Sequence, residues 1–291
     1  MPGGFRYVKP LTLEEALVEM AQDGAMILAG GQTLIPRLAA GMASPKILVD
    51  IGGLNELGKI EVGGNTISIG SMVRLGEAAA SILIKNRCRL LADCAGKTAT
   101  PAIRNRGTLV GNLAWGDPAS QLAVVAVALG AVFRLCRRDE FRHVAAEAFF
   151  VSANVTAVGP DELVSHLFVD GLGERTGSGL SFVALRQNSR ALAIATAVIT
   201  VDNGGIIERV SLAVGGCGDI PRKCYSVEAV LLGLPFEAAP DAAAAALIAN
   251  PPPLGVGVLD SEYAILVLPA LMRRAIRDAC SDVLNERAER T

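Results

Sequence analysis

The sequence has few aromatic residues and almost no excess of charge. Phe, Trp and Tyr make up 4% of its 291 residues, although 51% of the residues are hydrophobic, so we expect a core of closely packed aliphatic side chains. The 27 Lys and Arg residues are balanced by 29 Asp and Glu residues, which leaves a net charge of −2. Nucleic-acid binding needs a concentrated basic surface, so the composition excludes that class of function.

The sequence also lacks the cysteine and histidine patterns of metal sites. No two of its six cysteines form a CxxC pair, and only two histidines are present. The spacings of Cys88 with Cys94 and of Cys217 with Cys224 are too wide for zinc or iron–sulfur knuckles. We therefore expect no metal centre on this chain and expect the cysteines to be small buried side chains.

No hydrophobic run is long enough to span a bilayer. The longest run, Leu122 to Phe133, ends at Arg134 and is well short of the ~20 residues that a membrane helix needs. The first six residues lack the apolar segment of a signal peptide. These patterns predict a soluble cytoplasmic protein without a membrane span, in which this run is a buried helix.

The first part of the chain has the pattern of an α/β unit. Thr12 and Glu15 have the spacing of a capping box, which predicts a helix start. A strand at 26–29, a helix at 34–40 and a strand at 47–51 then predict a small βαβ module. From Lys59 the pattern changes to alternation, which predicts a hairpin.

The last part of the chain has a different pattern. Residues 171–179 are rich in glycine and polar residues and are predicted to be a linker. An antiparallel sheet covered by helices is expected after it, with strands at 181–185, 193–201 and 206–214 and helices at 225–232, 237–249 and 261–288. We therefore predict an α+β chain with domains at 1–175 and 176–291, the first divided into subdomains at about 1–57 and 58–175.

Common catalytic and nucleotide-binding motifs are missing. Gly96-Lys97-Thr98 resembles the end of a Walker A loop, but Leu91 stands where that loop needs glycine. GxGxxG, HExxH and GxSxG motifs are also absent. Ordinary Rossmann binding, zinc peptidase and serine hydrolase functions are therefore not supported.

Two glycine loops remain as candidate sites. The first glycine loop, residues 28–35, lies between a predicted strand and a predicted helix, and it can offer main-chain amides and the Thr33 hydroxyl to an anion. The second glycine loop, residues 104–114, concentrates arginine, asparagine, threonine and glycine just before the apolar helix. Buried polar groups need partners, which a polar ligand would supply. The alternatives are a plain tight turn for the first loop and a self-satisfied turn network for the second.

The two loops together closely resemble the FAD-binding medium subunits of the carbon monoxide dehydrogenase and xanthine dehydrogenase (molybdenum hydroxylase) family. The similar motifs are Ala29-Gly30-Gly31-Gln32-Thr33-Leu34-Ile35-Pro36 and Arg104-Asn105-Arg106-Gly107-Thr108-Leu109-Val110-Gly111-Asn112-Leu113, and the likeness extends along most of the chain. It implies a vanillyl-alcohol-oxidase (PCMH)-type FAD domain of two α/β subdomains. A smaller C-terminal domain with a three-stranded antiparallel sheet and helices would follow it.

The resemblance also implies which residues contact FAD. The expected cofactor-binding residues are Leu28, Ala29, Gly30, Gly31, Gln32, Thr33, Leu34, Ile35, Ala99, Thr108, Gly111, Asn112, Asp117, Ser120, Gln121, Val164 and Arg186. Val110 replaces a glycine of the family pattern, and Gln121 replaces a common acid. Because Gln32 is not histidine, FAD is expected to be held non-covalently.

The implied function is electron transfer within a larger enzyme. In such complexes a large subunit carries the molybdenum cofactor, a small subunit carries 2Fe–2S clusters, and the assembly is a dimer of heterotrimers. Electrons would pass through FAD to an external acceptor such as NAD⁺, oxygen or a quinone, and no side chain of this chain would act as acid or base. The alternatives are a free-standing flavin oxidoreductase of the same fold and a flavin-free scaffold subunit.

Overall fold

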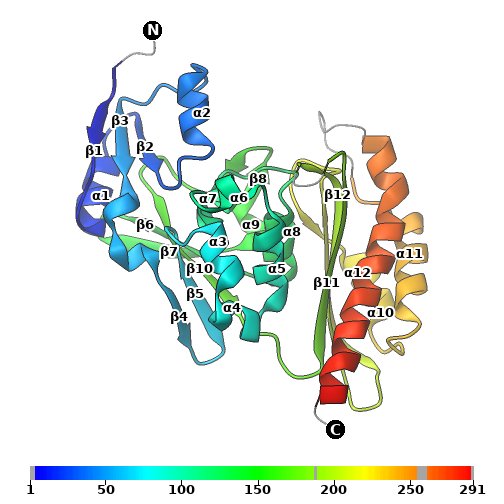
Figure 1. Cartoon of the computed structure of the whole chain (residues 1–291). Helices are drawn as coiled ribbons and strands as arrows, with labels where there is room; N and C mark the ends of the chain where they lie inside the picture. Colours follow the sequence, from blue (N-terminus) through cyan, green and yellow to red (C-terminus); the bar gives the residue numbers. More distant parts are fainter. Residues whose placement is uncertain (1–3, 187–188, 254–260, 290–291) are drawn as a thin grey trace.

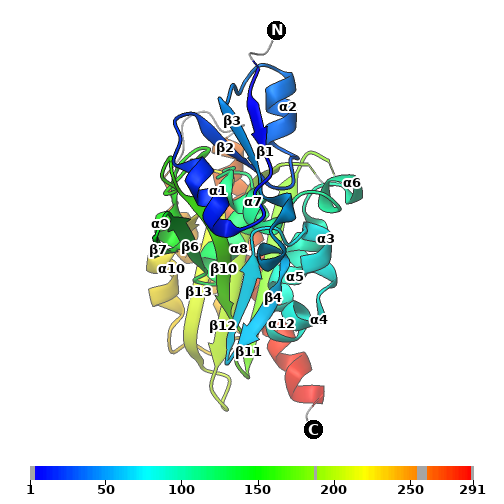
Figure 2. The same ribbon diagram turned by 90° about the vertical axis from the view of Figure 1, so that its left-hand side faces the viewer.

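The computed structural model describes residues 4–186, 189–253 and 261–289, and its three larger sheets follow one another along the chain (Figure 1), in addition to one two-stranded sheet. A parallel sheet near the N-terminus is followed by a five-stranded antiparallel sheet and then by a four-stranded antiparallel sheet. Figure 2 shows the same arrangement from the side of the N-terminal sheet. In the described part of the chain, no helix combines the length and the apolar character that crossing a bilayer requires.

The N-terminal sheet has the strand order β1-β3-β2, with both pairs parallel. Its elements are β1 (Arg6–Val8), α1 (Leu13–Met20), β2 (Ala25–Leu28), α2 (Leu34–Ala39), β3 (Ile47–Asp50) and the 3₁₀ turns η1 (Ile51–Gly53) and η2 (Asn55–Gly58). The βαβ module predicted from the sequence is therefore confirmed as β2, α2 and β3. Thr12 caps α1 by accepting a hydrogen bond from Glu15 N (3.1 Å), while the Glu15 carboxylate accepts from Leu11 N (2.8 Å). In the capping box predicted from the sequence, the Glu15 carboxylate would accept from the backbone N–H of Thr12. In the structure it accepts from that of Leu11, one residue earlier.

The middle sheet has the order β4-β5-β10-β6-β7, and each pair is antiparallel. Its strands are β4 (Ile60–Gly63), β5 (Thr66–Gly70), β6 (Val132–Arg137), β7 (Glu140–Ala145) and β10 (Leu163–Asp170). The accompanying elements are α3 (Leu75–Ala80), α4 (Ile82–Arg87), α5 (Arg89–Lys97), α6 (Pro101–Arg104), α7 (Leu109–Ala114), α8 (Gln121–Ala128), α9 (Ala146–Phe149), β8 (Phe150–Ser152) and β9 (Val155–Thr156). The predicted hairpin is confirmed as β4 and β5.

The C-terminal sheet carries three helices on its outer face (Figure 1). Its elements are β11 (Thr176–Ala184), β12 (Ala191–Val201), β13 (Ile207–Gly215), β14 (Arg222–Lys223), α10 (Tyr225–Leu231), α11 (Ala239–Ala249) and α12 (Ser261–Glu289). The antiparallel sheet and its helices were expected, but β14 adds a short fourth strand. The domain boundary at 175/176 stays a prediction.

The predicted linker at 171–179 is wrong in its second half, because β11 begins at Thr176. Gly177 and Gly179 do not make the segment flexible. They allow helix α12 to approach the backbone of β11 closely. A Cβ built on Gly177 would lie 1.9 Å from the Ala279 carbonyl oxygen, and one built on Gly179 would lie 2.0 Å from the Ala275 carbonyl oxygen. Helix α12 thus packs directly on the backbone of β11 along what we call the glycine seam.

Helix α8 lies between the middle and C-terminal sheets, and all eight of its residues are buried. It shares one hydrophobic core with Phe133 of the middle sheet and with Ile194 and Ala213 of the C-terminal sheet. A helix that is apolar on every side needs such a position. The buried helix predicted from the apolar run is confirmed.

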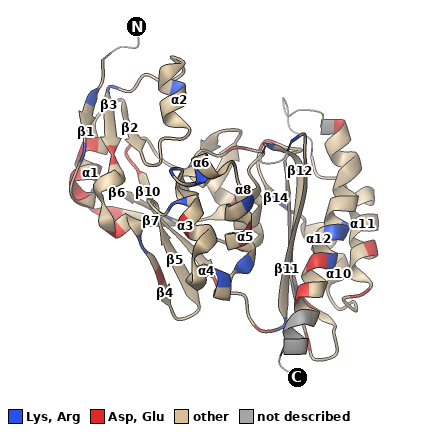
Figure 3. Cartoon of the chain, in the orientation of Figure 1, with Lys and Arg blue, Asp and Glu red and all other residues tan. Residues whose placement is uncertain are grey.

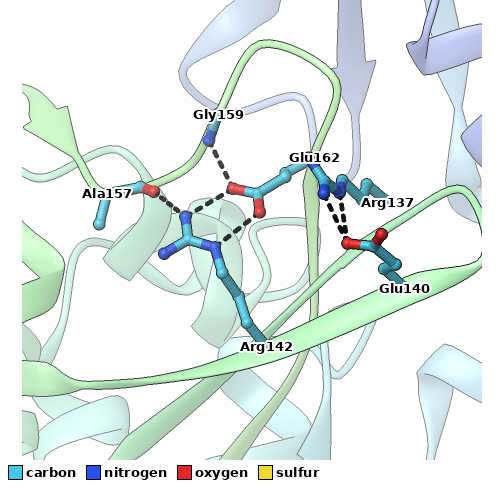
Figure 4. A network of polar contacts seen from close by, with 6 residues as sticks. All are labelled: Arg137, Glu140, Arg142, Ala157, Gly159 and Glu162. Carbon is cyan, nitrogen blue, oxygen red and sulfur yellow. Dashed lines mark hydrogen bonds and ion pairs between the residues drawn. The ribbon is translucent and has the colours of Figure 1, made fainter.

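A buried carboxylate ties β7 to the segment before β10 (Figure 4). Glu162, whose side chain is 8% exposed, accepts two hydrogen bonds of 2.7 Å from the Arg142 guanidinium and one of 2.7 Å from Gly159 N. Arg142 also donates to the Ala157 carbonyl oxygen (2.6 Å). The Arg142 guanidinium holds the pKa of Glu162 below its ordinary value, because it favours the ionised carboxylate.

Arg142→Ala should make the protein less stable at neutral pH, with a smaller effect in acid. A carboxylate with a depressed pKa contributes stability above its unfolded pKa near 4.5, and this contribution is lost as pH falls through the folded value. We expect a loss of roughly 1–2 kcal/mol at pH 7, less than for a fully buried pair because half of Arg142 is exposed. Urea unfolding from pH 7 to pH 3 measures this. The exposed Arg137–Glu140 pair is the control, and an equal loss in Arg137→Ala would contradict the interpretation.

Candidate cofactor-binding site

The two glycine loops meet at Gly30. A Cβ built on Gly30 would lie 2.4 Å from the Arg106 carbonyl oxygen, 2.7 Å from Gly107 Cα and 2.9 Å from Thr108 N. The Gln32 side chain also packs near Gly107, since its Cγ lies 3.4 Å from a Cβ built there. Two segments far apart in the sequence are therefore in direct contact at Gly30.

The first glycine loop presents a run of unpaired amides. The N–H groups of Gly30, Gly31, Gln32 and Thr33 have no hydrogen-bond acceptor among the residues that the structure describes. The loop turns at Gly31, whose φ of +72° favours glycine. Thr33 makes no side-chain cap on α2, so its hydroxyl is also available. Half-buried amides without acceptors are costly, and a polar ligand at this loop would satisfy them.

The other residues of the first glycine loop supply its apolar surroundings. Leu28 ends β2 and Ile35 lies in the first turn of α2, and their side chains flank Gly31 at 3.4 and 3.1 Å from a Cβ built there. Ala29 packs against the core under the N-terminal sheet, and Leu34 is the first residue of α2. The carbonyl oxygen of Gly31 accepts a hydrogen bond from Ile35 N (3.1 Å), which fixes the loop to its helix.

The second glycine loop is held against the turn that follows β5. Thr108 and Arg74 form an antiparallel bridge, flanked by hydrogen bonds from Leu75 N to Gly107 O (2.9 Å) and from Leu109 N to Val73 O (3.0 Å). Thr108 Oγ1 accepts from Gly111 N (3.0 Å). The Thr108 amide has no acceptor among the described residues, so it remains available beside Gly30.

The predicted residues after the second glycine loop form a connected network. Ser120 Oγ donates to Asn112 Oδ1 (2.8 Å), which joins α7 to the start of α8 and leaves the Asn112 amino group as a donor. Asp117 forms an ion pair with Arg190 Nη2 (2.7 Å) from the connection between β11 and β12. Gly216 N donates to Pro118 O (3.1 Å), so the C-terminal sheet also fixes this turn.

Ala99 adopts a backbone conformation that is unusual for alanine. Its φ is +55°, and Arg104 Nη1 donates to the carbonyl oxygens of Ala99 (2.5 Å) and Thr98 (3.3 Å). The left-handed region is unfavourable for a residue with a Cβ, so these bonds stabilise the turn. Arg104 therefore stabilises the backbone of the turn at Thr98 and Ala99, a few residues before it in the chain.

The structure does not bring all predicted residues to the loops. Val164 is buried in β10, and Arg186 is exposed in the β11–β12 connection, where it bonds with Ser189. Val164 shares a hydrophobic core with Leu109, Val110 and Leu113 of the second glycine loop, whereas no hydrogen bond or ion pair among the described residues joins Arg186 to a glycine loop. Gln121 is buried in the first turn of α8. Val110 is 1% exposed and packs in the core, so this departure from the family pattern does not fill the site.

Two arginines near the loops were missed by sequence reasoning. Arg74 Nη1 donates to the Arg106 carbonyl oxygen, and the Arg37 guanidinium lies 4.7 Å from the centre of the Trp115 ring. Neither arginine belongs to a recognisable motif. A cavity of about 500 Å³ lies elsewhere, beside β1 and α1, and its lining of three glutamates and one lysine does not suit an anion.

The described residues include no group of three or more His, Cys, Asp or Glu side chains suited to a metal ion. All six cysteines are buried, as expected from the sequence. Burial raises the pKa of Cys88, Cys94 and Cys224 to about 12 and that of Cys217 and Cys280 to about 11.

The thiols of the folded chain should therefore react very slowly with a disulfide reagent at pH 8. Only the thiolate is nucleophilic, and burial suppresses both ionisation and access. A reaction with Ellman's reagent should show less than one rapidly reacting thiol in the native chain, and all six after denaturation in guanidinium. Two or more rapidly reacting thiols in the native chain would contradict the buried placement.

The structure thus combines two sheet-containing subdomains that meet at the glycine loops with a C-terminal domain of one sheet and three helices. Residues 3–169 match the family described as FAD binding domain in molybdopterin dehydrogenase. Residues 181–279 match the family described as CO dehydrogenase flavoprotein C-terminal domain. The chain belongs to the FAD-binding flavoprotein subunits of the molybdopterin dehydrogenase family, which confirms the resemblance found in the sequence.

Named relatives are similar over 80% or more of this chain. The 6-hydroxypseudooxynicotine dehydrogenase complex subunit alpha of Paenarthrobacter nicotinovorans is 31% identical over 96% of this chain and 95% of its own. The glyceraldehyde dehydrogenase medium chain of Sulfolobus acidocaldarius is 34% identical over 80% of this chain and 82% of its own. A chain of carbon monoxide dehydrogenase from Hydrogenophaga pseudoflava superposes with a TM-score of 0.90 at 29% identity, covering 97% of this chain and 99% of that one.

Proposed function

We propose that this chain binds one FAD non-covalently, with the diphosphate between the two glycine loops. The observation that carries the proposal is the run of four loop amides, Gly30 to Thr33, without acceptors beside the equally unpaired amide of Thr108. The backbone of the second glycine loop lies directly beside Gly30, so both loops bring main-chain groups to this point. Gln32 carries a carboxamide, which cannot form the bond by which a histidine attaches flavin.

The remaining predicted residues extend this assignment. The Thr33 hydroxyl and the Asn112 amino group would add donors to the diphosphate, and the turn from Asp117 to Gln121 would lie near the ribose and adenine end. We retain Ala99, Val164 and Arg186 as proposed contacts by resemblance to the family. The support for Ala99 is its strained turn, since strained backbone is often found at functional sites.

The bound flavin would supply electron transfer between one-electron carriers and an external acceptor. The contribution of this chain is to bind the cofactor and orient it through main-chain hydrogen bonds, and no side chain is needed to move a proton. We propose a large molybdenum-binding subunit and a small iron–sulfur subunit as partners, in a dimer of heterotrimers. Relatives named as a complex subunit and as a medium chain of a dehydrogenase support membership of a multi-subunit enzyme. A cytoplasmic location remains part of the proposal, and the six free buried cysteines are consistent with it.

Copurification of the native complex with cofactor and metal analysis tests the proposal. We expect one FAD on this chain, and molybdenum and iron on its companions after the subunits are separated. A complex without flavin absorbance would favour a scaffold subunit. Turnover of an organic substrate by this chain alone would favour a free-standing oxidoreductase, and iron or molybdenum on the isolated chain would contradict the assignment.

A further inference from the structure

Arg74 lies next to the second glycine loop although it is distant from it in the sequence. It belongs to the turn between β5 and α3, and its backbone N donates to Glu77 Oε2 (2.9 Å). The hydrogen bonds that flank the bridge between Arg74 and Thr108 make the two residues a non-hydrogen-bonded antiparallel pair. Side chains of such a pair project from the same face and lie close together. The Arg74 side chain therefore extends along the loop that carries the unpaired Thr108 amide.

The Arg74 guanidinium is fixed where the two glycine loops cross. Its Nη1 donates to the Arg106 carbonyl oxygen, and this oxygen lies 2.4 Å from a Cβ built on Gly30. The guanidinium thus bonds to the second glycine loop at the backbone oxygen that lies beside Gly30 of the first glycine loop. A guanidinium carries five N–H donors, so several remain free for a further acceptor.

No carboxylate of the described residues lies within 4.0 Å of the Arg74 guanidinium as an ion-pair partner. Three other arginines near the site are occupied differently. Arg104 donates to two backbone carbonyls, Arg190 is paired with Asp117, and Arg37 lies over Trp115. Arg74 is half-buried, so its uncompensated charge is less screened than that of a fully exposed arginine.

We propose that Arg74 is a cofactor-binding residue that supplies positive charge to the diphosphate site and positions the second glycine loop through the Arg106 carbonyl. This inference rests on the proposed function, since the anion is the FAD diphosphate. It adds a charged side chain to the main-chain amides and the Thr33 hydroxyl that the sequence pattern offers to the anion. A planar guanidinium suits this role because it can donate to a carbonyl and to phosphate oxygens at once.

Titration of the full chain, freed of flavin, with FAD at several salt concentrations tests the inference. Arg74→Gln should raise the Kd for FAD about 10- to 100-fold, the usual effect of losing a charge-assisted hydrogen bond. It should also weaken the salt dependence of binding, because one charge contact is lost. Arg74→Lys keeps the charge and should recover most of the affinity and the salt dependence. Arg209→Gln, on an exposed position of β13, is the matched control and should bind as the unmodified chain does.

The melting temperature of the flavin-free chain separates binding from folding. The inference expects Arg74→Gln to change this temperature little while FAD affinity falls. Unchanged FAD affinity and salt dependence in Arg74→Gln would overturn it. Equal losses of affinity in the Gln and Lys variants, together with lower melting temperatures, would show a purely structural role and would also overturn it. Failure of the unmodified chain to bind FAD at all is a distinct result, which would reject the proposed function itself.

Discussion

A chain with alanine in place of Gly30 should not retain FAD through purification. The added methyl group would lie 2.4 Å from the Arg106 carbonyl oxygen and 2.7 Å from Gly107 Cα, both of them backbone atoms that cannot rotate away. The two glycine loops would have to separate, and the amides of the first loop would no longer be placed beside that of Thr108. We expect the Kd for FAD to rise by at least about 100-fold, equivalent to roughly 3 kcal/mol.

Flavin content per chain and titration with FAD measure this effect. Gly63→Ala is the matched control, because a Cβ built on Gly63 meets nothing within 4 Å and the residue ends an exposed strand. That variant should bind FAD normally. If Gly30→Ala also retained stoichiometric flavin, the crossing of the two loops would not be the binding site.

The second large effect is expected at the glycine seam. A Cβ built on Gly177 would lie 1.9 Å from the Ala279 carbonyl oxygen and 2.8 Å from Val283 Cγ2, so Gly177→Ala would force α12 away from β11. Overpacking of a buried contact typically costs 1–3 kcal/mol. Because the obstacle here is helix backbone, we expect a loss near the upper end, about 3 kcal/mol.

Urea unfolding of the full chain, followed by circular dichroism, measures this loss. Gly173→Ala is the control in the preceding connection, where the nearest atom to a built Cβ is Thr176 Oγ1 at 3.8 Å. The control should unfold at the same urea concentration as the unmodified chain. Equal midpoints for Gly177→Ala and Gly173→Ala would show that α12 does not pack on β11 as described.

Local patterns in the sequence predict much of the fold. The βαβ module follows from short apolar runs around a glycine turn, and the β4–β5 hairpin follows from alternation around Gly63-Gly64-Asn65. The buried helix α8 follows from an apolar run without any polar face. In each case the periodicity within about a dozen residues already determines the element.

The sequence-based predictions of the fold are wrong or incomplete where contacts between distant segments determine the structure. The glycines at 177 and 179 suggest a flexible linker, but α12, about 100 residues later, requires them for close packing. Strand β14 spans only Arg222 and Lys223, and its pairing with β13 is too short to leave a periodic signal. Such features depend on tertiary contacts rather than on local preference.

In the candidate site, too, the local features can be predicted from the sequence and the contacts between distant segments cannot. The two glycine loops stand out in the sequence by their composition, whereas their contact at Gly30 becomes visible only in three dimensions. Arg74 gave no signal, because its importance depends on a bridge to Thr108 that joins separate elements. The predicted roles of Val164 and Arg186 rest on resemblance, and they stay predictions.

The glycine seam also constrains the order in which the chain can complete its fold during synthesis. Ser178 N donates to Asp282 Oδ2 (3.2 Å) across a sequence separation of 104 residues. The residues of the N-terminal and middle sheets leave the ribosome long before α12 does, since synthesis proceeds from the N-terminus. The face of β11 that α12 covers therefore stays exposed until the last helix has been made, and an uncovered strand at the edge of a sheet favours aggregation during that time.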